Sequence, residues 1–128
     1  MVVNYFVGIF YMLHGLVHLL YMGHAFNYFE IEKGFVWPDN SKFLANRVGL
    51  KTKQRVAGVL CVIAALSFVL AGVSVLIWHS WHIQIVIAAV IASTVLFIAF
   101  WDGTTSKLHT QGGIGIFINA MILIYTFI

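Results

Sequence analysis

Charged residues are scarce in this sequence. Asp, Glu, Lys and Arg make up 9% of its 128 residues, whereas a water-soluble domain has about 25%. Hydrophobic residues make up 62%, and the mean hydropathy is +0.98. There is too little charge to cover the surface of a soluble domain, and the apolar residues form long continuous runs. The composition predicts an integral membrane protein.

Cysteine and proline each occur once. Because Cys61 has no second cysteine to pair with, an intrachain disulfide is excluded. It lies inside an apolar run, so we expect a buried and unreactive thiol. Pro38 lies in the one long polar stretch. The net charge of +3 comes from basic residues clustered mainly in that stretch, which indicates membrane topology and no nucleic-acid partner.

Four apolar segments cover most of the chain, at about residues 4–22, 56–77, 83–101 and 113–128. About 20 apolar residues cross the hydrocarbon core as a helix, and lipid requires every backbone amide to be bonded within the protein. Helices joined by short turns pack antiparallel. The sequence therefore predicts an all-α membrane protein, a single four-transmembrane-helix antiparallel bundle over residues 1–128. Residues 27–55 are expected to form a loop, either irregular or with a short interfacial helix capped by Ser41.

The basic residues predict the orientation. Six lie in the 27–55 loop and the seventh, Lys107, lies in the third connection, while the second connection and both tails have none. Short basic loops stay in the cytoplasm. We therefore expect the 27–55 loop inside the cell and both termini outside. The bilayer is then the main partner.

Small residues recur along one side of the second segment. Their spacing of seven places them on one helix face, which allows a neighbouring helix to approach closely. We interpret them as a packing seam: Ala57, Gly58, Ala64, Ala65, Ala71 and Gly72.

The first segment carries an unusual row of polar side chains. Five of them fall within an arc of about 100° on a helix, and such side chains inside a membrane are candidates for function because they are costly to expose to lipid. The row consists of Asn4, Tyr11, His14, His18 and Tyr21, of which Tyr11, His14, His18 and Tyr21 are candidate ligand-binding residues. Asn119 of the last segment is expected to face inward at a similar depth and to bind an imidazole.

The two histidines, one turn apart, leave several interpretations open. They are weak candidates for a metal site, because the i, i+4 spacing suits a metal but three or four ligands are normally needed. A bis-histidine haem fits poorly, since its axial ligands come from different helices. Neutral imidazoles bonded to a neighbouring helix, a small quinone-like ligand, and a proton relay all remain consistent with the spacing.

Signals for catalysis are weak. The sequence contains no nucleophile elbow, phosphate-binding loop or pair of acids. Asp102, after the third segment, is interpreted as a solvated carboxylate that pairs with Lys107 or Arg55. The sequence therefore does not favour an enzyme.

Several short motifs stand out together: His14-Gly-Leu-Val-His18-Leu-Leu, the helix from Arg55 to Gly72, Trp101-Asp102, and Gly115-x-x-x-Asn119. This combination resembles a family of small prokaryotic four-helix membrane proteins with an HGLIHL-type first helix and a G-x-x-x-N last helix. More distantly, it is similar to the DoxX-like proteins, some relatives of which are associated with quinone-linked sulfur oxidation. The resemblance implies a multi-pass protein of the prokaryotic plasma (inner) membrane and adds slight support for a quinone.

Three functions follow as expectations. The first is a binding or redox-accessory protein with a pocket for a quinone-like ligand, lined by His14, His18, Tyr11, Tyr21 and Asn119. The second is a structural or oligomerising subunit, as a homo-oligomer or in a larger complex, whose polar residues only join helices. The third is a small transporter that acts as an oligomer.

Overall fold

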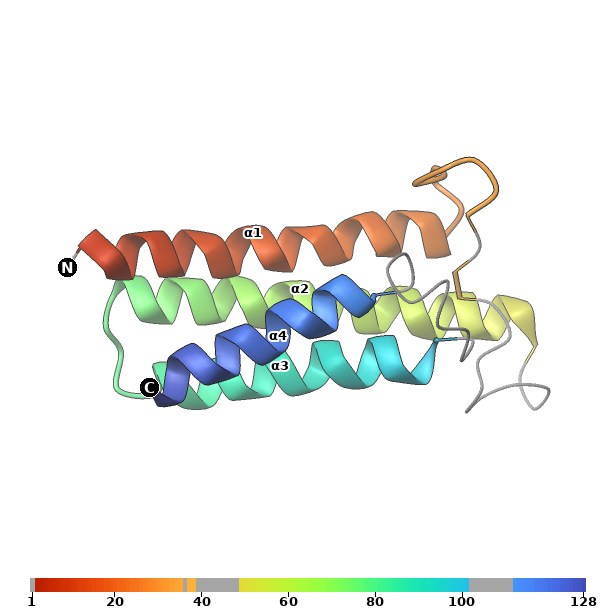
Figure 1. Cartoon of the computed structure of the whole chain (residues 1–128). Coiled ribbons are helices and arrows are strands. Elements are labelled where there is room, and N and C mark those ends of the chain that lie inside the picture. Colours follow the sequence, from red (N-terminus) through yellow and green to blue (C-terminus); the bar gives the residue numbers. More distant parts are fainter. Residues whose placement is uncertain (1, 36, 39–48, 102–111) are drawn as a thin grey trace.

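The computed structural model describes residues 2–35, 37–38, 49–101 and 112–128. Within these ranges the regular structure is entirely helical: α1 (Val2–Ala25), α2 (Leu50–Leu76), α3 (His82–Ala99) and α4 (Gly113–Phe127) (Figure 1). By length and composition α1, α2 and α3 are long and apolar enough to cross a membrane, and α4, with 15 residues, is a shorter apolar helix. The all-α prediction is confirmed.

The second helix starts earlier than its apolar run. It begins at Leu50 rather than near Val56, so the prediction of a loop as far as residue 55 is wrong at its end. Lys, Gln and Arg are good helix formers, and they extend α2 beyond the apolar run. The first helix also exceeds the predicted 4–22. The proposed interfacial helix at Ser41, and the pairing of Asp102 with Lys107, lie outside the described residues.

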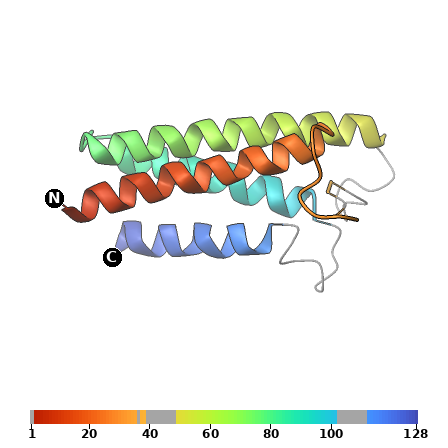
Figure 2. The ribbon, with the colours of Figure 1, turned by 90° about the horizontal axis from the view of Figure 1, so that it is seen from above.

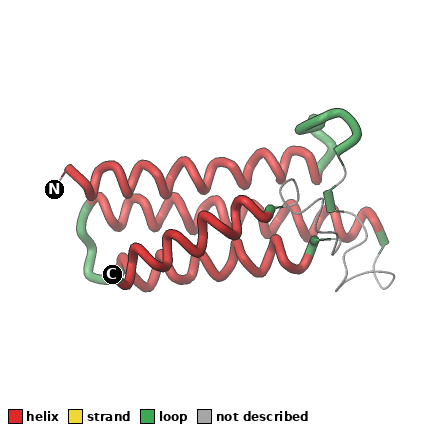
Figure 3. Tube along the Cα trace, viewed as in Figure 1, coloured by secondary structure: helices red, strands yellow, loops and turns green. Residues whose placement is uncertain are grey.

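Successive helices run antiparallel and lie side by side (Figures 1 and 3). Both termini are at one end of the bundle, here called the terminal end. The opposite end, where α1 leads into the loop after Ala25, is called the loop end. Close backbone contacts join α1 to α2, α2 to α3, and α3 to α4. No Cα atom of α1 comes within 8 Å of one in α4. One side of the bundle, between α1 and α4, therefore has no close backbone contact, and the two ribbons lie apart in the view from above (Figure 2).

The tightest interface joins α1 to α2. A Cβ atom on Gly72 would lie 2.5 Å from the carbonyl oxygen of Gly8, and a Cβ atom on Gly15 would lie 2.9 Å from that of Ala65. The predicted seam is buried throughout, and it packs against glycines of α1 that had not been assigned this role. The helices approach this closely because neither presents a bulky side chain here.

Two apolar clusters fill the bundle. One lies toward the terminal end around Phe68, Val86 and Ile122, and the other lies toward the loop end around Cys61, Trp37 and Phe97. Cys61 is a free, fully buried thiol, as expected. A group of polar side chains lies between the two clusters.

Candidate functional site

His14 and His18 lie on the inner face of α1, where only 6% and 1% of their surfaces are exposed. His14 Nε2 is 2.9 Å from Oδ1 of Asn119 on α4. His18 Nε2 is 2.7 Å from Oγ of Ser93 on α3. The Asn119 amide nitrogen donates to Ser93 Oγ at 2.9 Å and to Thr94 Oγ1 at 3.0 Å. We call this set of side chains the polar network.

The hydrogen-bond partners assign a tautomer to each imidazole. His18 Nδ1 lies 3.0 Å from the carbonyl oxygen of His14, which only accepts, so Nδ1 carries the proton. His18 Nε2 then accepts from the Ser93 hydroxyl, whose oxygen in turn accepts from Asn119. His14 Nε2 faces the carbonyl oxygen of Asn119 and therefore donates. His18 is thus assigned as a neutral ring, and His14 carries a proton on Nε2.

Aromatic rings enclose the two histidines. Phe68 of α2 meets the His14 ring edge to face, with 4.7 Å between centroids, and stacks on His18 at 5.6 Å. Phe97 of α3 lies 5.4 Å from His18. All four helices therefore contribute to this layer of the bundle. Because apolar surroundings make an unpaired polar group costly, the network is most stable when complete.

The structure brings His14, His18 and Asn119 together, as predicted. Ser93 and Thr94 complete the network, although neither had been assigned a polar role from the sequence. The spacing of Ser93 from Ala89, four residues earlier, was the available signal, but it indicated a small residue rather than a hydrogen-bond partner. Among the described residues no three His, Cys, Asp or Glu side chains are placed to share a metal ion.

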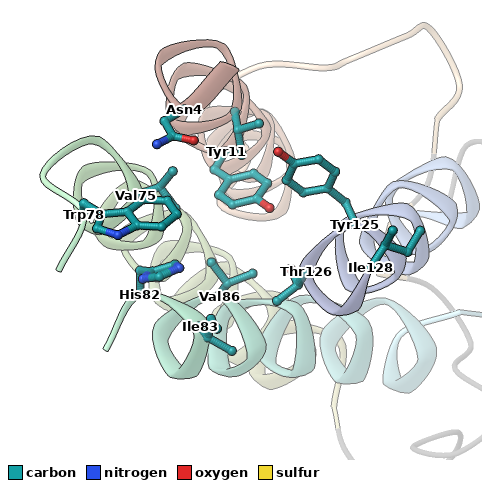
Figure 4. A pocket seen from close by; sticks show the side chains of 11 residues that line it. Asn4, Tyr11, Val75, Trp78, His82, Ile83, Val86, Tyr125, Thr126 and Ile128 are labelled. Atoms are coloured by element: carbon teal, nitrogen blue, oxygen red, sulfur yellow. The ribbon is translucent and has the colours of Figure 1, made fainter. Parts of the chain in front are cut away.

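Tyr11 belongs to a different place, a cavity of about 460 Å³ at the terminal end (Figure 4). The phenol of Tyr11 and the imidazole of His82 point toward the same space. His14, His18, Tyr21 and Asn119 do not line this cavity. Its polar lining comes from three helices: Asn4 and Tyr11 of α1, His82 of α3, and Tyr125 and Thr126 of α4.

The terminal cavity adjoins an apolar groove between α1 and α4. This groove, of about 340 Å³, shares Val7, Tyr11 and Tyr125 with the cavity. Its other lining residues are apolar: Phe6, Phe10, Met121 and Ile122. The groove follows the side of the bundle on which the backbones of α1 and α4 stay apart.

Tyr21 lies toward the loop end, in an aromatic cluster. Its ring is 5.1 Å from both Trp37 and Phe97 and 6.2 Å from Phe35. It shares a helix face with Tyr11, but ten positions of helix, or about 15 Å, separate them. The candidate residues therefore form three groups rather than one pocket.

A comparison with protein-family models, curated proteins and solved structures finds no match to this chain.

Proposed function

We propose that the chain is a plasma-membrane protein that crosses the bilayer four times, with both termini outside. Both termini lie at the same end of the antiparallel helices. The described basic residues of α2, Lys51, Lys53 and Arg55, lie in its first turns, toward the loop end. α4 is about 22 Å long at 1.5 Å per residue, and a short span is accommodated by local thinning of the bilayer.

We further propose that the terminal cavity binds an amphipathic ligand with a quinone-type head group. The single observation that supports this is a cavity with several polar side chains in a mainly apolar lining, which shares residues with an apolar groove between two helices. A volume of about 460 Å³ is within the usual range of small-molecule sites, roughly 300–1,000 Å³. The head group would occupy the cavity, and its hydrocarbon tail would lie in the groove.

The polar groups suit both redox forms of such a head group. The Tyr11 hydroxyl, which also lies within hydrogen-bonding reach of Thr126, can donate to a quinone carbonyl. His82 Nδ1 lies 2.7 Å from the carbonyl oxygen of His79, so Nδ1 donates there and Nε2 is left as an acceptor for a quinol hydroxyl. Trp78 stacks on the His82 ring at 4.8 Å and holds its orientation. This supports a binding or redox-accessory role rather than an enzyme.

In this proposal the histidine pair of α1 has an indirect role. The polar network joins α1 to α4 about one helical turn from Tyr11 toward the loop end. The two helices have no close backbone contact there. The network would set the width of the groove without touching the ligand. The ligand site expected around His14 and His18 is thus proposed to be centred on Tyr11.

Purified protein tests this proposal by a thermal shift on addition of a quinone with a short isoprenoid tail. Tyr11→Phe removes one hydroxyl and should weaken binding about 5- to 10-fold, because one hydrogen bond contributes about 1 kcal/mol. Tyr28→Phe, an exposed tyrosine outside the cavity, is the matched control. If the wild type shows no quinone-dependent shift, or if both variants bind alike, the proposal is wrong.

A structural or oligomerising subunit is the second candidate, and one observation favours it. The hydrogen bonds of His14, His18, Ser93 and Asn119 are made within the chain, so the network needs no ligand. Native mass spectrometry separates the candidates. A ligand-sized mass on a monomer supports the first, and a ligand-free oligomer supports this second one or a small transporter built as an oligomer.

A further inference from the structure

A second cavity, of about 310 Å³, lies at the loop end. It is formed by the end of α1, the segment that follows it, and the start of α2. The residues that line it are His24, Asn27, Phe29, Glu30, Phe35, Trp37, Pro38, Leu50 and Gln54. None of them lines the terminal cavity, so this loop-end cavity is independent of the proposed quinone site.

The charge of the loop-end cavity is opposite to that of the chain. The sequence has seven Lys and Arg against four Asp and Glu, yet among the described residues that line this cavity Glu30 is present and Lys and Arg are absent. The polar atoms of Asn27 and Gln54 add neutral partners. A carboxylate in the described part of the lining, with no Lys or Arg among those residues, favours a cationic ligand.

The remaining walls are largely aromatic. Phe29 packs over Gly23, where its ring occupies the space that a Cβ atom would need. The ring of Phe35 lies 4.7 Å from that of His24. Trp37, only 2% exposed, is held 5.1 Å from Tyr21. Aromatic faces attract organic cations through the ring quadrupole, and several rings around one space form the cages that recognise quaternary ammonium groups.

The segment that carries these rings is tied to α1 by hydrogen bonds. The backbone amide of Tyr28 donates to the Gly23 carbonyl at 2.8 Å, and that of Asn27 donates to the His24 carbonyl at 3.0 Å. The amide of Ile31 lies 3.5 Å from His24 Nδ1. The cavity is therefore shaped by the fold of the chain rather than by an occupant.

We propose that the loop-end cavity binds an alkylated ammonium group of the choline type, with Glu30 as the counter-charge and Phe29 and Phe35 as the aromatic walls. Such a group occurs both in free choline and in the head groups of zwitterionic lipids. The chemistry of recognition is the same for the two sources, and the experiment separates them.

The test uses the full-length protein in nanodiscs of phosphatidylglycerol, which has no ammonium group. Binding of choline is measured by calorimetry and compared with 3,3-dimethylbutan-1-ol, which has the same shape without the charge. Choline should bind at least about tenfold more tightly than the alcohol, since a desolvated cation–π contact is worth that factor. Glu30→Gln and Phe35→Leu should each weaken choline binding several-fold. Glu32→Gln changes an exposed acid outside the cavity lining and should leave binding unchanged.

The same titration in nanodiscs that contain phosphatidylcholine identifies the source of the ligand. Weaker apparent binding of free choline supports the proposal with the lipid head group as the occupant, and unchanged binding supports it with the soluble cation. Equal binding of choline and the alcohol, no binding of either, or equal effects of Glu30→Gln and Glu32→Gln would overturn it. A loss of quinone binding at the terminal cavity would not affect this result.

Discussion

His18 and Ser93 meet across the bundle, with 2.7 Å between Nε2 and Oγ, although no Cα atoms of α1 and α3 come within 8 Å of each other. Side chains alone therefore join these diagonal helices. The serine hydroxyl donates to the imidazole, and its oxygen accepts from Asn119. One small side chain thus links three helices.

Ser93→Ala should destabilise the protein more than an ordinary serine deletion. It leaves the His18 imidazole without its donor and Asn119 without one acceptor, in surroundings where an unsatisfied group costs about 1–3 kcal/mol. The free energy of unfolding in a detergent titration measures the loss. Ser67→Ala, which removes an exposed bond to the Ile63 carbonyl, is the control. Equal losses for the two variants would mean that the network adds nothing to stability.

The hydrogen bond between His14 and Asn119 can be measured by a double-mutant cycle. With His14→Ala, Asn119→Ala and the double variant, we expect a coupling energy of about 0.6–1.7 kcal/mol, the size found for such bonds in membranes. A coupling energy near zero would show that this hydrogen bond does not contribute to stability, despite the distance of 2.9 Å between its two atoms.

The α1–α2 interface predicts a contrast between neighbouring positions. Gly72→Leu forces a side chain against the Gly8 backbone. This overpacking should lower the free energy of unfolding by about 1–3 kcal/mol or more. Leu70→Ala removes a side chain that is 61% exposed and should cost less. The reverse order in the same unfolding assay would show that α1 and α2 do not pack through this seam.

The proposed orientation is tested by cysteine labelling in intact cells with a membrane-impermeant reagent. In a Cys61→Ala background, Ser80→Cys in the turn between α2 and α3 should react, and Thr52→Cys at the start of α2 should not. Both positions are exposed in the structure, so a difference reports the side of the membrane. Labelling of position 52 with protection of position 80 would reverse the topology.

Hydropathy was enough to predict the number and type of helices, because lipid leaves few alternatives for an apolar run. Hydropathy placed the start of α2 too late, because the Lys, Gln and Arg residues before the apolar run are good helix formers although they are not apolar. The helical arc correctly turned His14 and His18 inward. The same arc grouped Tyr21 with Tyr11, because it reports the face of a helix and carries no information on depth.

The role of Ser93 and the open side between α1 and α4 depend on which helices are neighbours. The sequence of one chain does not fix that choice, since several arrangements bury the same faces. The terminal cavity was missed for the same reason, because its polar lining is assembled from three helices.

The missing backbone contact between α1 and α4 has a consequence for biosynthesis. Among the four helices α4 is the last to be synthesised, so α1, α2 and α3 are made before Asn119 is present. During that interval His14 Nε2 lacks the acceptor that it has in the finished protein, while His18 can already bind Ser93. Asn119 of α4 then supplies the acceptor for the His14 imidazole. We therefore expect the contact between the first and last helices to form late in assembly.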